Sequence, residues 1–210
     1  MEKKETSEFT EMEVNEPISN FYGLDFEKSY TYADYLLWRF EERVELIRGK
    51  VFKMSPAPNT NHQRLSWNIN NQFSLNFKSK NSQLFFAPFD VRLPIPSKKK
   101  DSTVVQPDLC IICDETKLDE QGCNGAPDLV VEILSPGNTK HEMQTKFELY
   151  EESGVKEYWI VEPANKTVLV YSLQNNKYIG LKPFSDDADI KSILFPEIKV
   201  NLMDVFWNVK

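Results

Sequence analysis

The chain has 210 residues and a formal net charge of −7, with 40% of its residues hydrophobic and 27% charged. This composition predicts a soluble globular protein with one sizeable core. No apolar run approaches the ~20 residues that a membrane helix needs, and the N-terminus lacks the apolar core of a signal peptide. We therefore expect no membrane span and a cytoplasmic location.

Most of the net charge lies at the N-terminus. Residues 1–19 contain six Glu and two Lys and so contribute −4 of the total. We expect an acidic, disordered tail over residues 1–19 and a single domain over residues 20–210. The net charge of −7 argues mildly against indiscriminate binding to nucleic acid, but the distribution of the charge matters more than its sum.

The three cysteines, Cys110, Cys113 and Cys123, cannot all pair with one another, and a cytoplasmic chain would keep them reduced. The spacing of Cys110 and Cys113 is that of half a zinc site. Residues three apart in a strand point to opposite faces, however, and no second pair follows. We interpret the cysteines as buried and structural, with metal ligation as the alternative.

The first predicted elements are a helix over residues 31–42 and a β-hairpin. The hairpin pairs residues 43–47 with residues 50–54 around the turn Arg48-Gly49. Glu45 is thus a carboxylate within a strand.

A second amphipathic helix is predicted where Leu65, Ile69, Phe73 and Phe77 recur at four-residue spacing. His62 falls in its first turn. A histidine at that position either caps and packs the helix or belongs to a functional site.

Two strands are predicted next, over residues 84–93 and 104–112. The polar loop between them contains the lysine run 98–100, which is either solvated or contacts phosphate. Asp108 stands among apolar neighbours in the second strand, and a polar connection is expected over residues 114–125.

The apolar run of residues 126–136 predicts a strand buried on both faces, with Glu132 near its end. Because side chains alternate along a strand, Val130 and Glu132 would share one face and Val131 and Ile133 the other. An ionised carboxylate there loses its hydration. It therefore requires a compensating positive charge, a raised pKa or a metal ion.

A third helix is predicted from the capping-box sequence Thr139-Lys140-His141-Glu142 to Gly154. Its buried stripe would consist of Met143, Phe147 and Tyr150. Lys146 lies about 40–60° from that stripe, so its ammonium can reach over the edge of the sheet. The remaining predictions are a strand over residues 155–161, a hairpin around Asn175-Asn176 and a short helix from Asn201.

Three carboxylates from separate predicted strands, Glu45, Asp108 and Glu132, and one lysine, Lys146, form the candidate site. Carboxylates brought close together repel one another, so such a cluster suits Mg²⁺ or Mn²⁺. A bound metal lowers the pKa of water and stabilises phosphoryl charge, and a lysine adds a mobile positive charge. Together these groups indicate phosphodiester hydrolysis. The alternative is a set of ion-paired acids at strand ends.

Several ordered motifs carry a resemblance to a known family. They are Glu45-Leu46-Ile47-Arg48-Gly49-Lys50, Pro107-Asp108, the run from Pro127-Asp128 to Ser135-Pro136, Lys146-x-x-x-Tyr150, and Gly154-Val155-Lys156-Glu157-Tyr158-Trp159-Ile160-Val161. From about residue 30 to 205 the chain resembles the Uma-two family of restriction endonucleases, in the PD-(D/E)XK nuclease superfamily. The resemblance implies an α/β, restriction-endonuclease-like core with a mixed β-sheet flanked by helices.

The same resemblance implies roles for individual residues. Asp108 and Glu132 would be the two metal-binding acids, and Glu45 an accessory acid that also contacts the metal. His62 would contact phosphate or assist proton transfer. The implied cofactor is Mg²⁺ or Mn²⁺.

The chain departs from the superfamily pattern at Leu134, where a lysine is usual. In this family the lysine is supplied from the following helix, which here implies Lys146. A further acid in that helix corresponds to Glu142, whose role stays open. Asp128, which follows a proline, is interpreted as a turn residue at the start of the strand.

The first functional hypothesis is a Mg²⁺-dependent endodeoxyribonuclease that acts on DNA, as a homodimer if two sites address two strands. The second is a nucleic-acid-binding or regulatory protein on the same fold without turnover. The third is a metal phosphodiesterase that acts on a small nucleotide.

Overall fold

The computed structural model describes residues 21–39, 41–54, 59–76, 82–96, 101–135 and 140–210. The predicted acidic tail, the lysine run and the Thr139 end of the capping box lie outside these residues.

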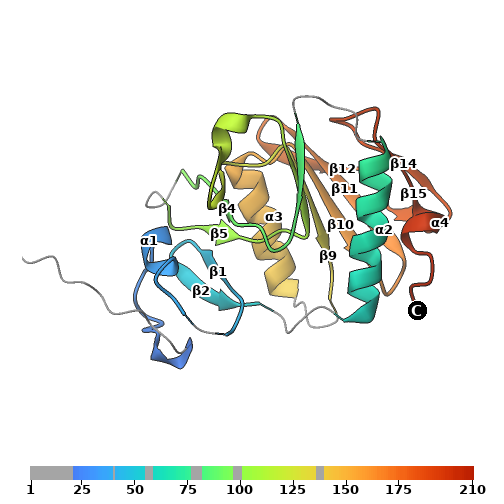
Figure 1. The fold of residues 1–210 in the computed structure, drawn as a ribbon. Helices are drawn as coiled ribbons and strands as arrows, with labels where there is room; N and C mark the ends of the chain where they lie inside the picture. Colours follow the sequence, from blue (N-terminus) through green and yellow to red (C-terminus); the bar gives the residue numbers. More distant parts are fainter. Residues whose placement is uncertain (1–20, 40, 55–58, 77–81, 97–100, 136–139) are drawn as a thin grey trace, which may run out of the picture.

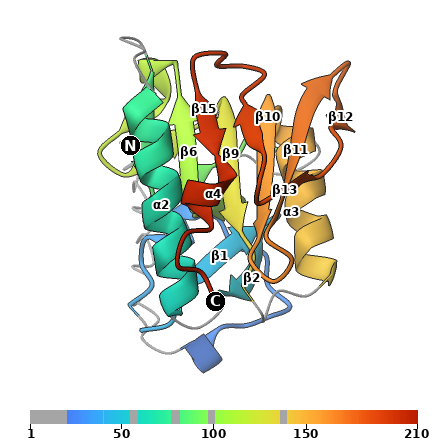
Figure 2. The same cartoon turned by 90° about the vertical axis from the view of Figure 1, so that its right-hand side faces the viewer.

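A mixed seven-stranded sheet forms the centre of the molecule (Figures 1 and 2). Its strands, in spatial order, are β12 (Lys177–Gly180), β11 (Thr167–Gln174), β10 (Glu157–Glu162), β9 (Leu129–Ile133), β6 (Leu109–Ile112) and β3 (Gln83–Phe86), and β13 (Phe184–Ser185) also pairs with β11. β9 and β10 are parallel and the other pairs are antiparallel.

A second sheet of six short strands carries the N-terminal hairpin. Its order is β2 (Lys50–Lys53), β1 (Val44–Ile47), β5 (Val104–Val105), β4 (Val91–Arg92), β8 (Gly122–Asn124) and β7 (Leu118–Asp119). The predicted hairpin is confirmed, and both turn residues have left-handed backbones, with φ of 52° at Arg48 and 81° at Gly49.

Two long helices cover opposite faces of the central sheet. α2 (Thr60–Asn76) lies on one face beside the ribbon of β14 (Asp189–Lys191) and β15 (Lys199–Asn201) and the short helix α4 (Leu202–Val205) (Figure 2). α3 (Lys140–Ser153) lies behind the sheet in that view, and the second sheet joins its hydrophobic cluster. Two cores therefore meet at β9, one on each face.

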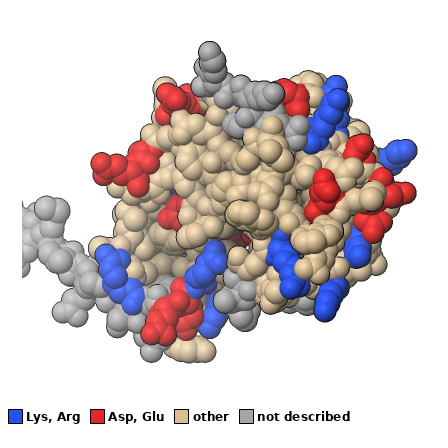
Figure 3. Space-filling view, turned by 45° about the vertical axis from the view of Figure 1, so that its right-hand side comes forward, with Lys and Arg blue, Asp and Glu red and all other residues tan. Residues whose placement is uncertain are grey.

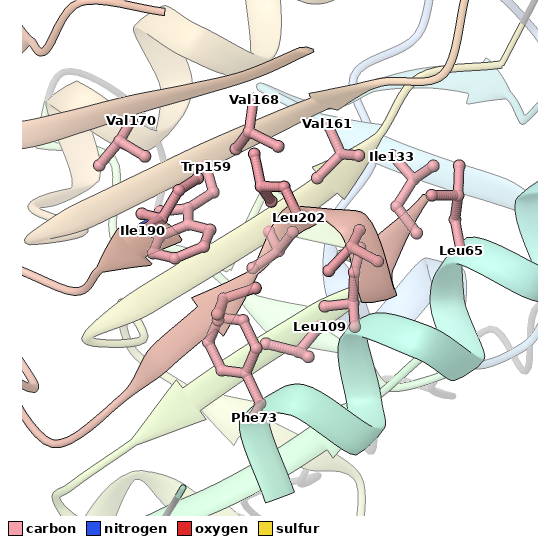
Figure 4. Packing of buried hydrophobic residues seen from close by; sticks show 14 of the residues in the cluster. Leu65, Phe73, Leu109, Ile133, Trp159, Val161, Val168, Val170, Ile190 and Leu202 are labelled. Carbon is pink, nitrogen blue, oxygen red and sulfur yellow. The ribbon is translucent and has the colours of Figure 1, made fainter. Parts of the chain in front are cut away.

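The alternation predicted for β9 is confirmed. Leu129, Val131 and Ile133 pack into the α2 cluster, whereas Val130 belongs to the α3 cluster. Figure 4 shows Ile133 within the α2 cluster. The α2 cluster also contains the predicted helix positions Leu65, Ile69 and Phe73. Glu132 thus points toward the side of the sheet where α3 and the hairpin lie.

Both long strands predicted upstream of β9 are broken in two, which the sequence prediction missed. Residues 84–93 divide into β3 and β4, and residues 104–112 into β5 and β6, so each segment crosses from one sheet to the other. The breaks contain Pro88 and Pro107, which have no N–H to donate to a sheet ladder. As a result Asp108 lies at a crossing between the sheets.

Two other predictions were wrong. The first helix is only α1 (Tyr32–Tyr35), because the chain turns after it to bury Trp38 while the Arg39 guanidinium donates to the carbonyls of Leu36 and Trp38. The predicted polar connection contains the hairpin of β7 and β8, which extends the second sheet.

Substitution Gly49→Ala is expected to destabilise the hairpin by about 2 kcal/mol, because left-handed backbone costs about 1–2 kcal/mol in residues with a side chain. A Cβ at Gly49 would also lie 2.2 Å from Ser29 Oγ. Gly154→Ala is the matched control, since φ there is +90° and a Cβ would meet nothing within 4 Å. Urea denaturation should give a larger loss at Gly49 than at Gly154, and equal losses would contradict the steric contribution.

Candidate functional site

A cleft of about 130 Å³ lies where the β1–β2 hairpin, the end of β9, the start of α2 and the first half of α3 meet. The structure places all five sequence-predicted site residues in its lining: Glu45, His62, Asp108, Glu132 and Lys146. Glu142 and Leu134, singled out in the sequence, line it as well.

Glu132 is a buried acid of the cleft. Its Oε1 accepts hydrogen bonds from Lys146 Nζ at 2.8 Å and from the Tyr150 hydroxyl at 2.7 Å. Burial raises the pKa of Glu132 to about 7; the charges of Asp108 and Glu45 act in the same direction, and Lys146 opposes them. The carboxyl group is therefore poised to change charge near neutral pH.

Lys146 extends from α3 and bridges two acids. Its Nζ lies 2.9 Å from Glu45 Oε1 as well as 2.8 Å from Glu132 Oε1. Burial by itself disfavours the ammonium, but the two carboxylates outweigh that effect and raise the pKa of Lys146 above its ordinary value. The lysine is therefore charged at neutral pH.

Glu45 ties the hairpin to the break between β5 and β6. It is buried on β1, and its Oε1 accepts the backbone N–H of Gln106 at 3.0 Å in addition to the Lys146 ammonium. The backbone of Gln106, two residues before Asp108, is thereby held against the cleft.

Asp108 and His62 form the side of the cleft next to α2. Asp108 Oδ2 accepts the backbone N–H of Ile133 at 2.8 Å, and its Oδ1 lies 3.4 Å from His62 Nε2. Burial lowers the pKa of His62, but the hydrogen bond and charge of Asp108 outweigh it, so the pKa is raised. His62 Nδ1 is buried and has no hydrogen-bond partner among the described residues.

The acids suit a hard divalent cation in their chemistry. Every hydrogen bond that Glu45 and Glu132 make within the described parts of the chain falls on Oε1, which leaves both Oε2 atoms as potential ligands. These described parts contain no group of three or more His, Cys, Asp or Glu side chains already gathered closely enough to hold a metal ion. The oxygen donors fit Mg²⁺ or Mn²⁺, and the metal site itself stays a prediction.

Sequence reasoning missed two residues that orient the acids. Tyr150 was assigned only to the buried stripe of α3, yet its hydroxyl donates to Glu132. The motif Lys146-x-x-x-Tyr150 contained the signal, because residues four apart lie on the same helix face. The backbone contact from Gln106 to Glu45 had no sequence signal, since it joins residues 61 apart.

Other sequence candidates lie outside the cleft. Asp128 is buried before β9 and accepts the Cys113 N–H at 2.8 Å and the Lys156 ammonium at 2.6 Å, so it links three strands. All three cysteines are free. Cys110 packs in the α3 cluster and Cys113 against the α2 cluster, on opposite faces as expected.

Tyr150→Phe is expected to lower the free energy of unfolding by about 2 kcal/mol, because a hydrogen bond to a charged group contributes about 1.5–3 kcal/mol. Tyr178→Phe is the matched control: its hydroxyl donates to the neutral Val155 carbonyl at 2.9 Å. Urea unfolding at pH 8 should show the larger loss at Tyr150. If the order were reversed, the Tyr150 hydroxyl would not be anchoring a carboxylate.

Comparisons with known proteins bear on the family and the fold. The family model Uma2, described as "Putative restriction endonuclease", matches residues 32–203. Among solved structures, the chain is similar to a "putative nuclease belonging to DUF820" from Anabaena variabilis, with 21% identity over 84% of this chain and 97% of that one and a TM-score of 0.65. At this identity the likeness is one of fold, and it confirms the predicted restriction-endonuclease-like α/β core. No curated protein matches the chain.

Within the described residues, none of the helices combines the length and the apolar character that crossing a membrane would require.

Proposed function

Because the chain belongs to the Uma2 family of restriction endonucleases, we propose that it is a metal-dependent endodeoxyribonuclease that hydrolyses phosphodiester bonds of DNA in this cleft. The observation that carries the proposal is that three carboxylates and one helix-borne ammonium meet in a single cleft. Glu45 and Glu132 lie on strands, and Asp108 lies at the break between β5 and β6.

Asp108, Glu132 and Glu45 would hold Mg²⁺ or Mn²⁺ through their oxygens. When bound, the metal would stabilise charge on a phosphoryl oxygen and lower the pKa of water. Until a metal binds, burial and mutual repulsion keep the pKa of Glu132 high. Metal binding would therefore release a proton near neutral pH.

Lys146 would supply a fixed positive charge to the phosphate undergoing attack. Its ammonium is already oriented by two carboxylates, so little reorganisation is needed during the reaction. His62 would contact phosphate or assist proton transfer, with its imidazole held beside Asp108 through Nε2.

The direct test is incubation of the purified protein with supercoiled plasmid and with linear DNA, in Mg²⁺, in Mn²⁺ or in EDTA. Metal-dependent nicking of the closed plasmid is the expected result, because an endonuclease needs no free end. Glu148→Gln, at an exposed position of α3, is the control for loss of one carboxylate. Metal-dependent DNA binding without cleavage would instead favour the silent binding protein, and cleavage of small nucleotides alone would favour the phosphodiesterase.

A metal-dependent gain in stability is expected as well. Mg²⁺ or Mn²⁺ at ten times its Kd should stabilise the native state by about 1.4 kcal/mol through mass action. Asp108→Asn should lose most of that gain, since an amide is a weaker ligand for a hard cation. Thermal unfolding with and without metal measures the shift, and a full shift in the variant would remove Asp108 from the ligands.

A further inference from the structure

The β1–β2 hairpin forms one wall of the cleft and presents more than Glu45. Side chains alternate along β1, so Val44 and Leu46 enter the hydrophobic cluster behind the hairpin while Glu45 and Ile47 line the cleft. On β2, Phe52 is paired directly with Glu45 in the antiparallel register and lines the cleft too. The wall thus combines a proposed metal-binding acid with an aromatic ring.

Phe52 lines the cleft and is 37% exposed, so part of its ring is open to solvent. Its ring makes no aromatic contact with the other described residues. The exposed part of the ring is therefore available to a flat ligand group, and the pairing of Phe52 with Glu45 places that group next to the acids.

Arg43 adds a positive charge to the same wall of the cleft. It is exposed, lines the cleft and makes no ion pair with the described residues. Its guanidinium donates to Gln106 Oε1 at 3.0 Å, and the amide of Gln106 is oriented in turn by a 2.8 Å hydrogen bond to Asp90. By contrast, the cleft's Lys53 and Lys146 are paired with carboxylates.

Arg43 and Phe52 are diagonal neighbours in the hairpin, because Met54 pairs with Arg43 and Phe52 with Glu45. Such neighbours are about 7–8 Å apart between Cα atoms, so one nucleotide can contact both. We propose that this wall binds an unpaired nucleotide of a single strand, with its base stacked on Phe52 and an adjacent phosphate on Arg43. The proposal rests on the proposed nuclease function and names its substrate class.

Single strands are favoured over duplex for two reasons. In a duplex both faces of an internal base are covered by neighbouring bases, whereas an unpaired base offers a face for stacking worth about 1–3 kcal/mol. Duplex binding depends on neutralising many phosphates. Figure 3 shows Lys and Arg across the lower half of one face, with acidic residues among and around them. The chain as a whole carries −7.

The test measures, by fluorescence anisotropy, the affinity of the protein for a short fluorescent single-stranded oligonucleotide and for the corresponding duplex. The measurements are made in Mg²⁺ with the full chain carrying Lys146→Met, so that cleavage is prevented. We expect the single strand to bind at least about 10-fold more tightly than the duplex. Phe52→Leu should weaken single-strand binding about 10-fold, the scale of one lost stack, and Phe52→Trp should retain it. Trp67→Leu, at an exposed aromatic position of α2 outside the cleft lining, should change nothing.

Arg43→Gln gives an independent readout. It should reduce the slope of log affinity against log salt by about 0.7, as expected for one lost phosphate contact with a single strand. Unchanged single-strand binding in Phe52→Leu, or equal affinity for duplex, would overturn the inference. Metal-dependent plasmid cleavage by the wild type would in that case leave the proposed function standing, whereas a protein that neither binds nor cleaves any nucleic acid would overturn both.

Discussion

Substitution Lys146→Met is expected to lower metal-dependent DNA cleavage by about 10²-fold or more, the scale seen when one oriented electrostatic donor is removed. The ammonium lies within 2.9 Å of Glu45 and 2.8 Å of Glu132, in the cleft that would hold the phosphate. Methionine keeps the aliphatic length that packs on α3 and removes only the charge. The readout is the rate of plasmid nicking at saturating Mg²⁺.

A matched control and a folding check accompany this variant. Lys156→Met makes the same change at the other end of β9, where Lys156 pairs with Asp128, and it should cleave at the wild-type rate. Removing one partner of a buried ion pair can destabilise a protein by about 3–5 kcal/mol, so circular dichroism must show that the Lys146 variant is folded. A folded variant that nicks plasmid as fast as the wild type would end the catalytic role of Lys146.

The parts of the fold governed by local periodicity were predictable. The two-residue alternation of β9 placed Glu132 on the correct side of the sheet, and the four-residue spacing from Leu65 to Phe73 gave the buried face of α2. The reach of Lys146 followed from its angle to the helix stripe. In each case the signal lies within one element.

Features set by contacts between distant segments were not predictable. The crossings near Pro88 and Pro107 divide apparently continuous strands between two sheets, and an apolar run does not show which sheet it joins. The helix predicted to Glu42 ends at Tyr35 because Trp38 is buried against Tyr30 and Tyr35, a tertiary effect.

The candidate site, too, was predictable from the sequence only in part. The identities of Glu45, Asp108 and Glu132 came from strand context and motif resemblance, and the structure places them in one cleft. Their orientation depends on Tyr150 and on the backbone of Gln106, which become neighbours of the acids only after folding. Residue types could therefore be named from the sequence, but the hydrogen bonds that leave particular oxygens available could not.

Substitution Glu132→Gln is expected to change how stability depends on pH. Burial, with help from Asp108 and Glu45, raises the pKa of Glu132 from 4.5 to about 7 in the folded protein. Between those values the folded chain binds more protons than the unfolded chain, so the free energy of unfolding falls as pH rises through this window. Each pKa unit corresponds to about 1.36 kcal/mol, which gives a loss of about 3 kcal/mol that glutamine cannot show.

Metal-free urea unfolding at pH 4, 6 and 8 measures this loss, with Glu148→Gln as the exposed control for removing a carboxylate from the same region. The advantage of Glu132→Gln over the wild type should grow by about 3 kcal/mol from pH 4 to pH 8, because only the wild type must ionise a buried acid. A difference that stayed constant across this range would mean that Lys146 and Tyr150 already stabilise the ionised carboxylate fully. Glu132 would then be a permanently charged partner of Lys146, and metal binding would release no proton from it.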